Sequence, residues 1–182
     1  VWSKKGIKVT TGKNNVDRTN DSVVYVGDKN TDNTDRASSD TQSENQSYSV
    51  DVSQLGGMYS EKIHLVDNGQ GLGVRNAGHI GASAGDVKID SQGRIVNSGT
   101  ISATHQADLN AEKVIENKGK IETKQGNAVL RSQTRVEQHG SIVSRQGGVL
   151  LQTKDKVTQT GETVAKGDVQ YLAKNIEVKS GA

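Results

Sequence analysis

The sequence predicts an all-β protein whose short strands coil into a parallel β-helix, a fold in which successive turns of the chain stack on one another. Three observations lead to this fold class: a repeat of 20 to 21 residues, a spacing of two inside each repeat, and few large apolar residues. Only 31% of the 182 residues are hydrophobic and 3% are aromatic, and Phe, Pro and Cys are absent. A narrow core made of stacked columns needs no more than this, whereas a two-layer domain would need more.

Five stretches between residues 74 and 163 share one pattern. Each has an aliphatic residue, an amide two positions later, a glycine two positions after that, and then Ile, which is replaced by Thr in the fifth stretch. The repeat glycines lie 21, 20, 21 and 21 residues apart. Alternate residues of a strand face opposite sides, so this spacing places the aliphatic residue, the amide and the Ile on one face. The amide, glycine and Ile positions are Asn76, Gly78, Ile80, Asn97, Gly99, Ile101, Asn117, Gly119, Ile121, Gln138, Gly140, Ile142, Gln159 and Gly161.

The repeats differ in length at one place only. A second apolar pair lies 8 or 9 residues after each glycine, and the next glycine always follows 12 residues after the first member of that pair. A turn tolerates an inserted residue, whereas a paired strand does not. We therefore expect turns at residues 84–85, 104–106, 124–126, 145–147 and 166–167.

Stacking the repeats at the strand spacing of ~4.8 Å turns equivalent residues into columns. The predicted apolar columns are Val74, Ile95, Ile115, Val136 and Val157; Ile80, Ile101, Ile121, Ile142 and Thr163; and Ile89, Leu109, Leu130, Leu151 and Tyr171.

The amides share this inward parity, which favours a ladder in which each amide donates a hydrogen bond to the next coil. The alternative is that they are turn-forming residues that face water. The repeat glycine either takes a positive φ or allows a close turn. After Gly161 the next amide and aliphatic positions hold Lys179 and Glu177, so the register is expected to slip or the repeat to degenerate.

Residues 1–70 do not show the repeat cleanly. Strands are predicted at residues 7–9, 23–26, 48–52 and 62–66, and the stretch at about 27–47 is polar and without apolar periodicity. We interpret that stretch as an exposed loop, for which a binding role is the less favoured alternative. The chain is accordingly divided into an irregular part, 1–70, and a regular repeat part, 71–182.

Charge and motif content argue against several functions. The 23 basic and 21 acidic residues are interspersed, which gives no support to nucleic-acid binding, and no apolar run has membrane-spanning length. The four histidines lack ligand spacing, so we predict no metal, no cofactor and no catalytic residue. The enzymatic alternative is a β-helix polysaccharide hydrolase or lyase, in which Glu116, Glu137 and Glu162 would align. The short turns offer no cleft for such an enzyme.

Two motifs carry a resemblance to a known family. Residues 50–66 contain Leu-Gly-Gly-Met-Tyr, and residues 71–82 contain Gly-Val-Arg-Asn-Ala-Gly-His-Ile. Over about residues 48–173 the chain resembles two-partner secretion exoproteins, which include filamentous haemagglutinins and contact-dependent growth inhibition exoproteins. The match is to the junction where the secretion domain passes into haemagglutinin-type repeats. The Asn-Pro motifs of that secretion domain are absent, because the chain has no proline.

The resemblance implies a right-handed β-helix, exported through an outer-membrane two-partner transporter and placed at the bacterial cell surface or secreted. Residues 1–70 would continue the secretion domain, and residues 71–182 would be haemagglutinin-type repeats. The predicted function is a non-enzymatic shaft of a large exoprotein used for adhesion or contact-dependent toxin delivery. A receptor- or glycan-binding adhesin module, meeting a host or bacterial surface receptor, is the alternative. Because the chain starts at Val1 rather than Met, we expect it to be a fragment of a longer protein.

Overall fold

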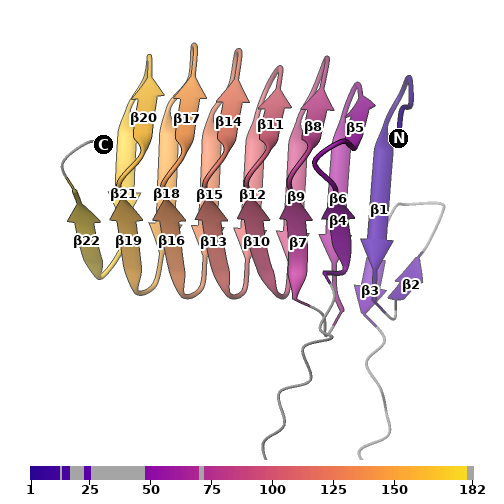
Figure 1. The fold of residues 1–182 in the computed structure, drawn as a ribbon, viewed down its shortest axis with the longest axis horizontal. Coiled ribbons are helices and arrows are strands. Elements are labelled where there is room, and N and C mark those ends of the chain that lie inside the picture. Colours follow the sequence, from indigo (N-terminus) through magenta and orange to yellow (C-terminus); the bar gives the residue numbers. More distant parts are fainter. Residues whose placement is uncertain (13, 17–22, 26–47, 70–71, 180–182) are drawn as a thin grey trace, which may run out of the picture.

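The computed structural model describes residues 1–12, 14–16, 23–25, 48–69 and 72–179, and within them every regular element is a strand. The strands form coils that stack side by side along the long axis of the molecule (Figure 1). The predicted all-β, parallel solenoid class is confirmed. The described residues include no helix with the length and apolar character needed to cross a membrane.

Each regular coil contributes one strand to each of three parallel sheets. The first sheet holds β1 (Ile7–Thr11), β6 (Ile63–Asp67), β9 (Val87–Ser91), β12 (Ala107–Ala111), β15 (Ala128–Ser132), β18 (Val149–Thr153) and β21 (Val169–Leu172). The second holds β4 (Val50–Val52), β7 (Gly73–Asn76), β10 (Arg94–Asn97), β13 (Val114–Asn117), β16 (Arg135–Gln138), β19 (Lys156–Gln159) and β22 (Asn175–Val178). The third holds β5 (Gly57–Ser60), β8 (His79–Ala82), β11 (Thr100–Ala103), β14 (Lys120–Thr123), β17 (Ser141–Ser144) and β20 (Glu162–Ala165). A separate antiparallel pair joins β2 (Asn14–Val16) and β3 (Val23–Tyr25).

The pairing register joins equivalent repeat positions. Ile95 lies opposite Ile115, and Ile101 lies opposite Ile121. The predicted turn segments all fall between strands, where a change of one residue leaves the pairing intact. The polar stretch at 27–47 lies outside the described residues.

The core is a set of stacked aliphatic columns inside the three sheets. Leu109, Ile115 and Ile121, one from each sheet, are all fully buried. All three columns extend beyond the predicted repeats, because Val50 pairs with Val74, Met58 with Ile80 and Leu65 with Ile89. Few residue types therefore suffice to exclude water, in agreement with the low hydrophobic content.

In the last described coil the residues are displaced by one position from the register that the repeat predicts. Ile176, rather than Glu177, lies opposite Val157, and Val178, rather than Lys179, lies opposite Gln159. Strand β21 has four residues where β9, β12, β15 and β18 have five, and two residues follow in each case, so the chain enters the second sheet one residue early. The expected slip of register is thus located at this corner.

Candidate functional site

The amide positions of the repeat lie inside the solenoid. Asn76, Asn97, Asn117, Gln138 and Gln159 are all buried. Asn76 Nδ2 donates to Asn97 Oδ1 at 2.8 Å, and Asn97 Nδ2 donates to Asn117 Oδ1 at 2.7 Å. Asn117 Nδ2 continues the series to Gln138 Oε1 at 2.7 Å. This ladder supplies the polar partners that buried amides require.

The ladder stops at both ends for identifiable reasons. Asn76 follows Val52 in the column, so within the described residues its Oδ1 is buried without a hydrogen-bond partner. At the other end, Gln138 Nε2 donates to the carbonyls of Gly140 at 3.0 Å and Glu162 at 3.1 Å. The extra methylene of glutamine carries its amide past the position that an asparagine amide occupies. The expected run through Gln159 is therefore shorter in the structure.

The repeat glycines lie at a corner where adjacent coils come close. None of them has a positive φ, which among the described residues occurs only at Gly12 and Gly73. A Cβ at Gly119 would instead collide with the backbone carbonyl of Gly99, and the same conflict recurs at Gly99, Gly140 and Gly161. Gly119 N–H also donates to the Asn97 carbonyl at 3.0 Å. Close backbone approach, one of the two expected reasons, accounts for these glycines.

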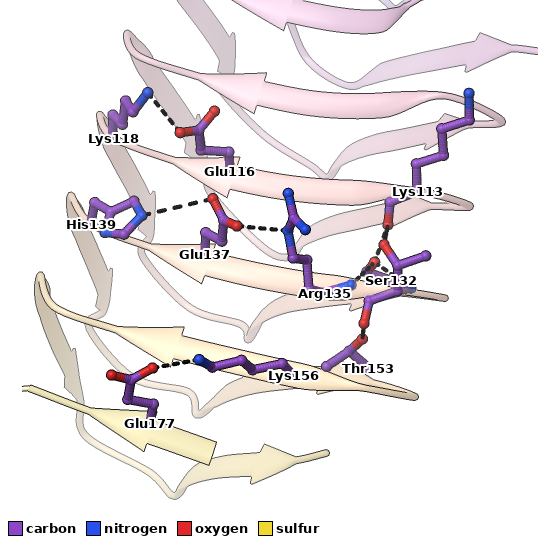
Figure 2. Close-up of polar contacts among 11 residues, drawn as sticks. Lys113, Glu116, Lys118, Ser132, Arg135, Glu137, His139, Thr153, Lys156 and Glu177 are labelled. Atoms are coloured by element: carbon purple, nitrogen blue, oxygen red, sulfur yellow. Dashed lines mark hydrogen bonds and ion pairs between the residues drawn. The ribbon is translucent and has the colours of Figure 1, made fainter. Parts of the chain in front are cut away.

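An outward polar group lies on β13 and β16, and Figure 2 shows its members in adjacent coils. Glu116 and Glu137 are paired across the strands, and His139 follows at the corner. One ligand-type atom from each of these three residues lies within 4.8 Å of the others. His139 Nδ1 is hydrogen-bonded to Thr160 Oγ1 at 2.6 Å, while its Nε2 is 3.9 Å from Glu137.

Cations already occupy both carboxylates of this group. Lys118 Nζ lies 2.6 Å from Glu116, and Arg135 Nε lies 2.7 Å from Glu137. The hydrogen bond to Glu116, followed by its negative charge, raises the pKa of the Lys118 ammonium above its ordinary value. Each carboxylate is therefore held in an ion pair with a neighbouring cation. We therefore interpret the group as a surface ion-pair network.

The enzymatic alternative placed a third carboxylate beside this pair, and that expectation is wrong. Glu162 begins β20 in the third sheet, where it lies opposite Ser141. Conversely, the expectation from sequence missed His139, which lies close to Glu137 because both stand next to Gln138. Aligning the residues that flank each repeat amide would have indicated this neighbourhood, since stacking turns equivalent positions into columns.

The fold and the repeat define a parallel β-solenoid built from stacked coils. Over 119 residues the chain is 40% identical to a protein named Toxin CdiA from Yersinia pestis, a match that covers 65% of this chain and 3% of that protein. It is 52% identical over 54 residues to tRNA nuclease CdiA-2 from Burkholderia pseudomallei, covering 30% of this chain and 2% of that protein. It is 41% identical over 54 residues to 16S rRNA endonuclease CdiA from Enterobacter cloacae, covering 30% of this chain and 2% of that protein.

No protein-family profile matches the chain, and no solved structure matches it. The chain spans only 2 to 3% of the length of these curated relatives. The chain is related to the CdiA contact-dependent inhibition exoproteins, which belong to the two-partner secretion family. The resemblance carried by the repeat motifs is thereby confirmed.

Proposed function

We propose that this chain is a non-enzymatic shaft segment of a large exoprotein used for adhesion or contact-dependent toxin delivery. The observation that carries the proposal is the uninterrupted stacking of coils from β4 to β22, with amides and aliphatic residues buried between neighbouring coils. In such a stack each added repeat lengthens the rod without changing its cross-section. The secreted, cell-surface location of the chain follows from its CdiA relatives.

The repeat residues have a structural role in this proposal. The amide ladder links coils by directional hydrogen bonds, and the repeat glycines allow the corners to stack closely. A one-residue slip between coils would turn the inward residues outward, and a two-residue slip would place an amide against an aliphatic column, which leaves polar groups unpaired. We therefore propose that the ladder amides hold the coils in register; these are Asn76, Asn97, Asn117 and Gln138.

The names of the relatives refer to toxin and nuclease activities, and we propose that any such activity lies outside this segment. The segment corresponds to 2 to 3% of each relative, so most of each relative has no counterpart here. Its outward acids Glu116 and Glu137 belong to an ion-pair network rather than to an arrangement suited to acid and base catalysis. The expected result is that the purified chain leaves tRNA and 16S rRNA intact under conditions in which a control nuclease degrades them.

Export through an outer-membrane partner transporter, as two-partner secretion implies, is part of the proposal. A parallel solenoid suits this route because each emerging coil can stack on the coil already outside. A receptor on a host or bacterial cell is the second proposed partner. An antibody against residues 72–179 should label intact cells, and protease added outside should remove the signal. A signal found only in the cytoplasm contradicts the surface location.

A register-preserving deletion tests the shaft role directly. Asn97 pairs with Asn117, so removing residues 98–117 from the full-length exoprotein deletes one complete coil and joins equivalent positions. We expect surface display to be retained. Removal of residues 98–107 is the matched control, because it joins Asn97 to Asp108 and puts the columns out of step. Equal display of the two deletions would contradict a role that depends on coil stacking.

A further inference from the structure

A hollow of about 490 Å³ opens on the outward face of the third sheet, over β5, β8, β11 and β14. It lies on a different sheet from the ion-pair network of Figure 2, which is carried by β13 and β16 of the second sheet. Its lining combines two aromatic rings, a histidine, hydroxyl groups and residues of both charges. This mixture of an apolar platform with convergent polar groups is typical of a small-ligand site.

The aromatic platform consists of Trp2 and Tyr59. Trp2 bridges in parallel to Tyr59, so the two residues occupy one outward column in neighbouring coils. Trp2 is 76% exposed and Tyr59 is 43% exposed. The chain contains one Trp and four Tyr, so this column concentrates a scarce residue type. Tyr59 lies within the stack, between Trp2 and Gly81, and an outward ring at such a position on a polar solenoid indicates a surface that meets a partner.

The next residue of that column is Gly81, which lies opposite Tyr59 and leaves the floor of the hollow without a side chain. A Cβ at Gly81 would lie 3.3 Å from His79 Nε2 and 3.4 Å from Tyr59 Cδ1. The His79 ring packs edge-on to Tyr59 with a centroid distance of 5.1 Å, and its Nε2 is 3.0 Å from Ser102 Oγ. The walls of the hollow are therefore ordered before any ligand arrives.

The charges around the hollow balance. Lys4 and Lys124 line it together with Glu61 and Glu122, so the formal charges of the lining residues sum to zero, and Lys120 and Arg145 contact Glu122 from outside the lining. The hydrogen bond from Lys120 is the largest influence on Glu122, and with Arg145 it outweighs the opposing effect of burial and lowers the pKa of this carboxyl. Glu122 is thus an ionised acceptor for hydroxyl groups. A balanced rim gives no general attraction for sulfated or sialylated chains.

We propose that this hollow binds a neutral oligosaccharide, with pyranose rings stacked on Trp2 and Tyr59. The C–H groups on one face of a pyranose carry partial positive charge and suit the negative face of an aromatic ring. Glu122, Ser102 and His79 can form hydrogen bonds with the hydroxyl groups at the edge of the pyranose ring. From Trp2 to Glu122 the column spans four coil steps of ~4.8 Å, roughly 19 Å, which is long enough for a short glycan.

This inference deepens the proposed surface role by naming a ligand class, and it is tested independently of the shaft. Trp2 is the sole tryptophan, so its intrinsic fluorescence reports on the hollow without a label. The chain is titrated with lactose, maltotriose and an N-acetylglucosamine trimer, and in parallel with sialyllactose and a heparin oligosaccharide. We expect saturable changes in Trp2 emission with at least one of the neutral sugars, and weak dependence on salt.

Variants locate the binding. Tyr59→Ala should weaken the affinity roughly tenfold, the order expected for loss of one aromatic contact. Gly81→Val should also weaken it, because a side chain then fills the floor while a β-branched residue suits a strand. Val164→Ala is the matched control, since Val164 stands farther along the same outward column and does not line the hollow. Circular dichroism verifies the fold of each variant.

Three results overturn the proposal: no response to any neutral sugar at millimolar concentration, binding restricted to the acidic glycans, or equal affinity in Gly81→Val and the unmodified chain. If Tyr59→Ala does not fold, Gly81→Val and Trp2→Ala, followed by calorimetry, still decide the question. Failure here leaves the shaft proposal untouched, because the coil deletions measure display rather than sugar binding.

Discussion

The central coils and the last described coil carry the same kind of strand, but they differ in burial. Ile115 and Ile121 are 1% and 0% exposed, whereas Ile176 and Val169 are 49% and 40% exposed. The backbone pairing is equivalent, because β22 pairs in parallel with β19 just as β16 pairs with β13. The difference is that a central coil has a described neighbour on both sides (Figure 1).

At the C-terminal end of the described stack the inward positions are exposed because no described coil covers them, whereas Val50, in the edge strand at the other end of the second sheet, is still buried. A solenoid has no core that belongs to one coil, so stability is a sum of intrinsic coil terms and interfaces between neighbours. The same substitution should therefore have different effects in the two regions.

The largest expected effect comes from a charge placed in the central columns. Ile121→Asp puts an unpaired carboxylate in a dry site and should lower the free energy of unfolding by at least about 4 kcal/mol. Ile176→Asp, in the half-exposed coil, should lower it by less than about 1 kcal/mol. Urea denaturation followed by far-ultraviolet circular dichroism measures both. Similar midpoints for the two variants would contradict the comparison.

The repeat glycine is expected to be the next most sensitive position. Gly119→Ala forces a Cβ into the Gly99 carbonyl, so the coils must separate locally, at a cost of about 3 kcal/mol. Gly81→Ala is the control, because the atoms nearest to its added Cβ belong to side chains at 3.3 Å or more. The same denaturation experiment should find the control close to the unmodified chain. An equally stable Gly119→Ala variant would show that close corner stacking is unnecessary.

Breaking the ladder should have an intermediate effect. Asn97→Ala leaves the Asn76 donor and the Asn117 acceptor without their amide partner, and we expect a loss of about 2 kcal/mol. Gln159→Ala should cost less, because Gln159 Nε2 donates within its own coil, to the Gly161 carbonyl and to Thr163 Oγ1. Thermal unfolding of the two variants provides the comparison. A larger loss at Gln159 would argue against a cross-coil ladder as the register device.

The smallest effect is pH-dependent and lies on the outer face. The pKa of Glu122 is lowered in the folded chain, chiefly by the hydrogen bond from Lys120. Its contribution is therefore present above the ordinary carboxyl range and is lost as pH falls through the lowered folded pKa. Glu122→Gln should reduce stability at neutral pH by less than about 1 kcal/mol, because the ion pairs are partly exposed to solvent. Denaturation curves at several pH values should converge in acid; a constant difference would contradict this linkage.

The residues of each strand that face inward were predictable from the sequence, because the direction in which a side chain points depends on its short-range spacing along the strand. Aliphatic, amide and Ile positions recur at intervals of two, and this pattern indicated the columns that pair in the structure. The length of the ladder was not predictable in the same way. Whether Gln138 donates to Gln159 or to a backbone carbonyl depends on where the longer side chain ends, and the class of amide residue does not specify this.

The outer face shows more clearly how far the sequence alone can predict which side chains become neighbours. Glu162 follows a repeat glycine and looks equivalent to other acids in the sequence, but it begins a strand of a different sheet from Glu116 and Glu137. The residues singled out from the sequence were all structural repeat positions, and they included neither the ion-pair network nor the aromatic hollow. Both depend on side chains in neighbouring coils that meet on an outward face.

The sequence by itself determined the solenoid, its period and its buried columns, because a strict repeat with a spacing of two has few other ways to bury its apolar residues. Only the tertiary structure decided which outward residues became neighbours. Trp2 meets Tyr59 in a column that also contains Gly81, although a long stretch of chain separates the first two. The physical reason is that the stacking of coils brings residues that are far apart along the chain into adjacent strands. The sequence shows which residues become adjacent only where the repeat is regular.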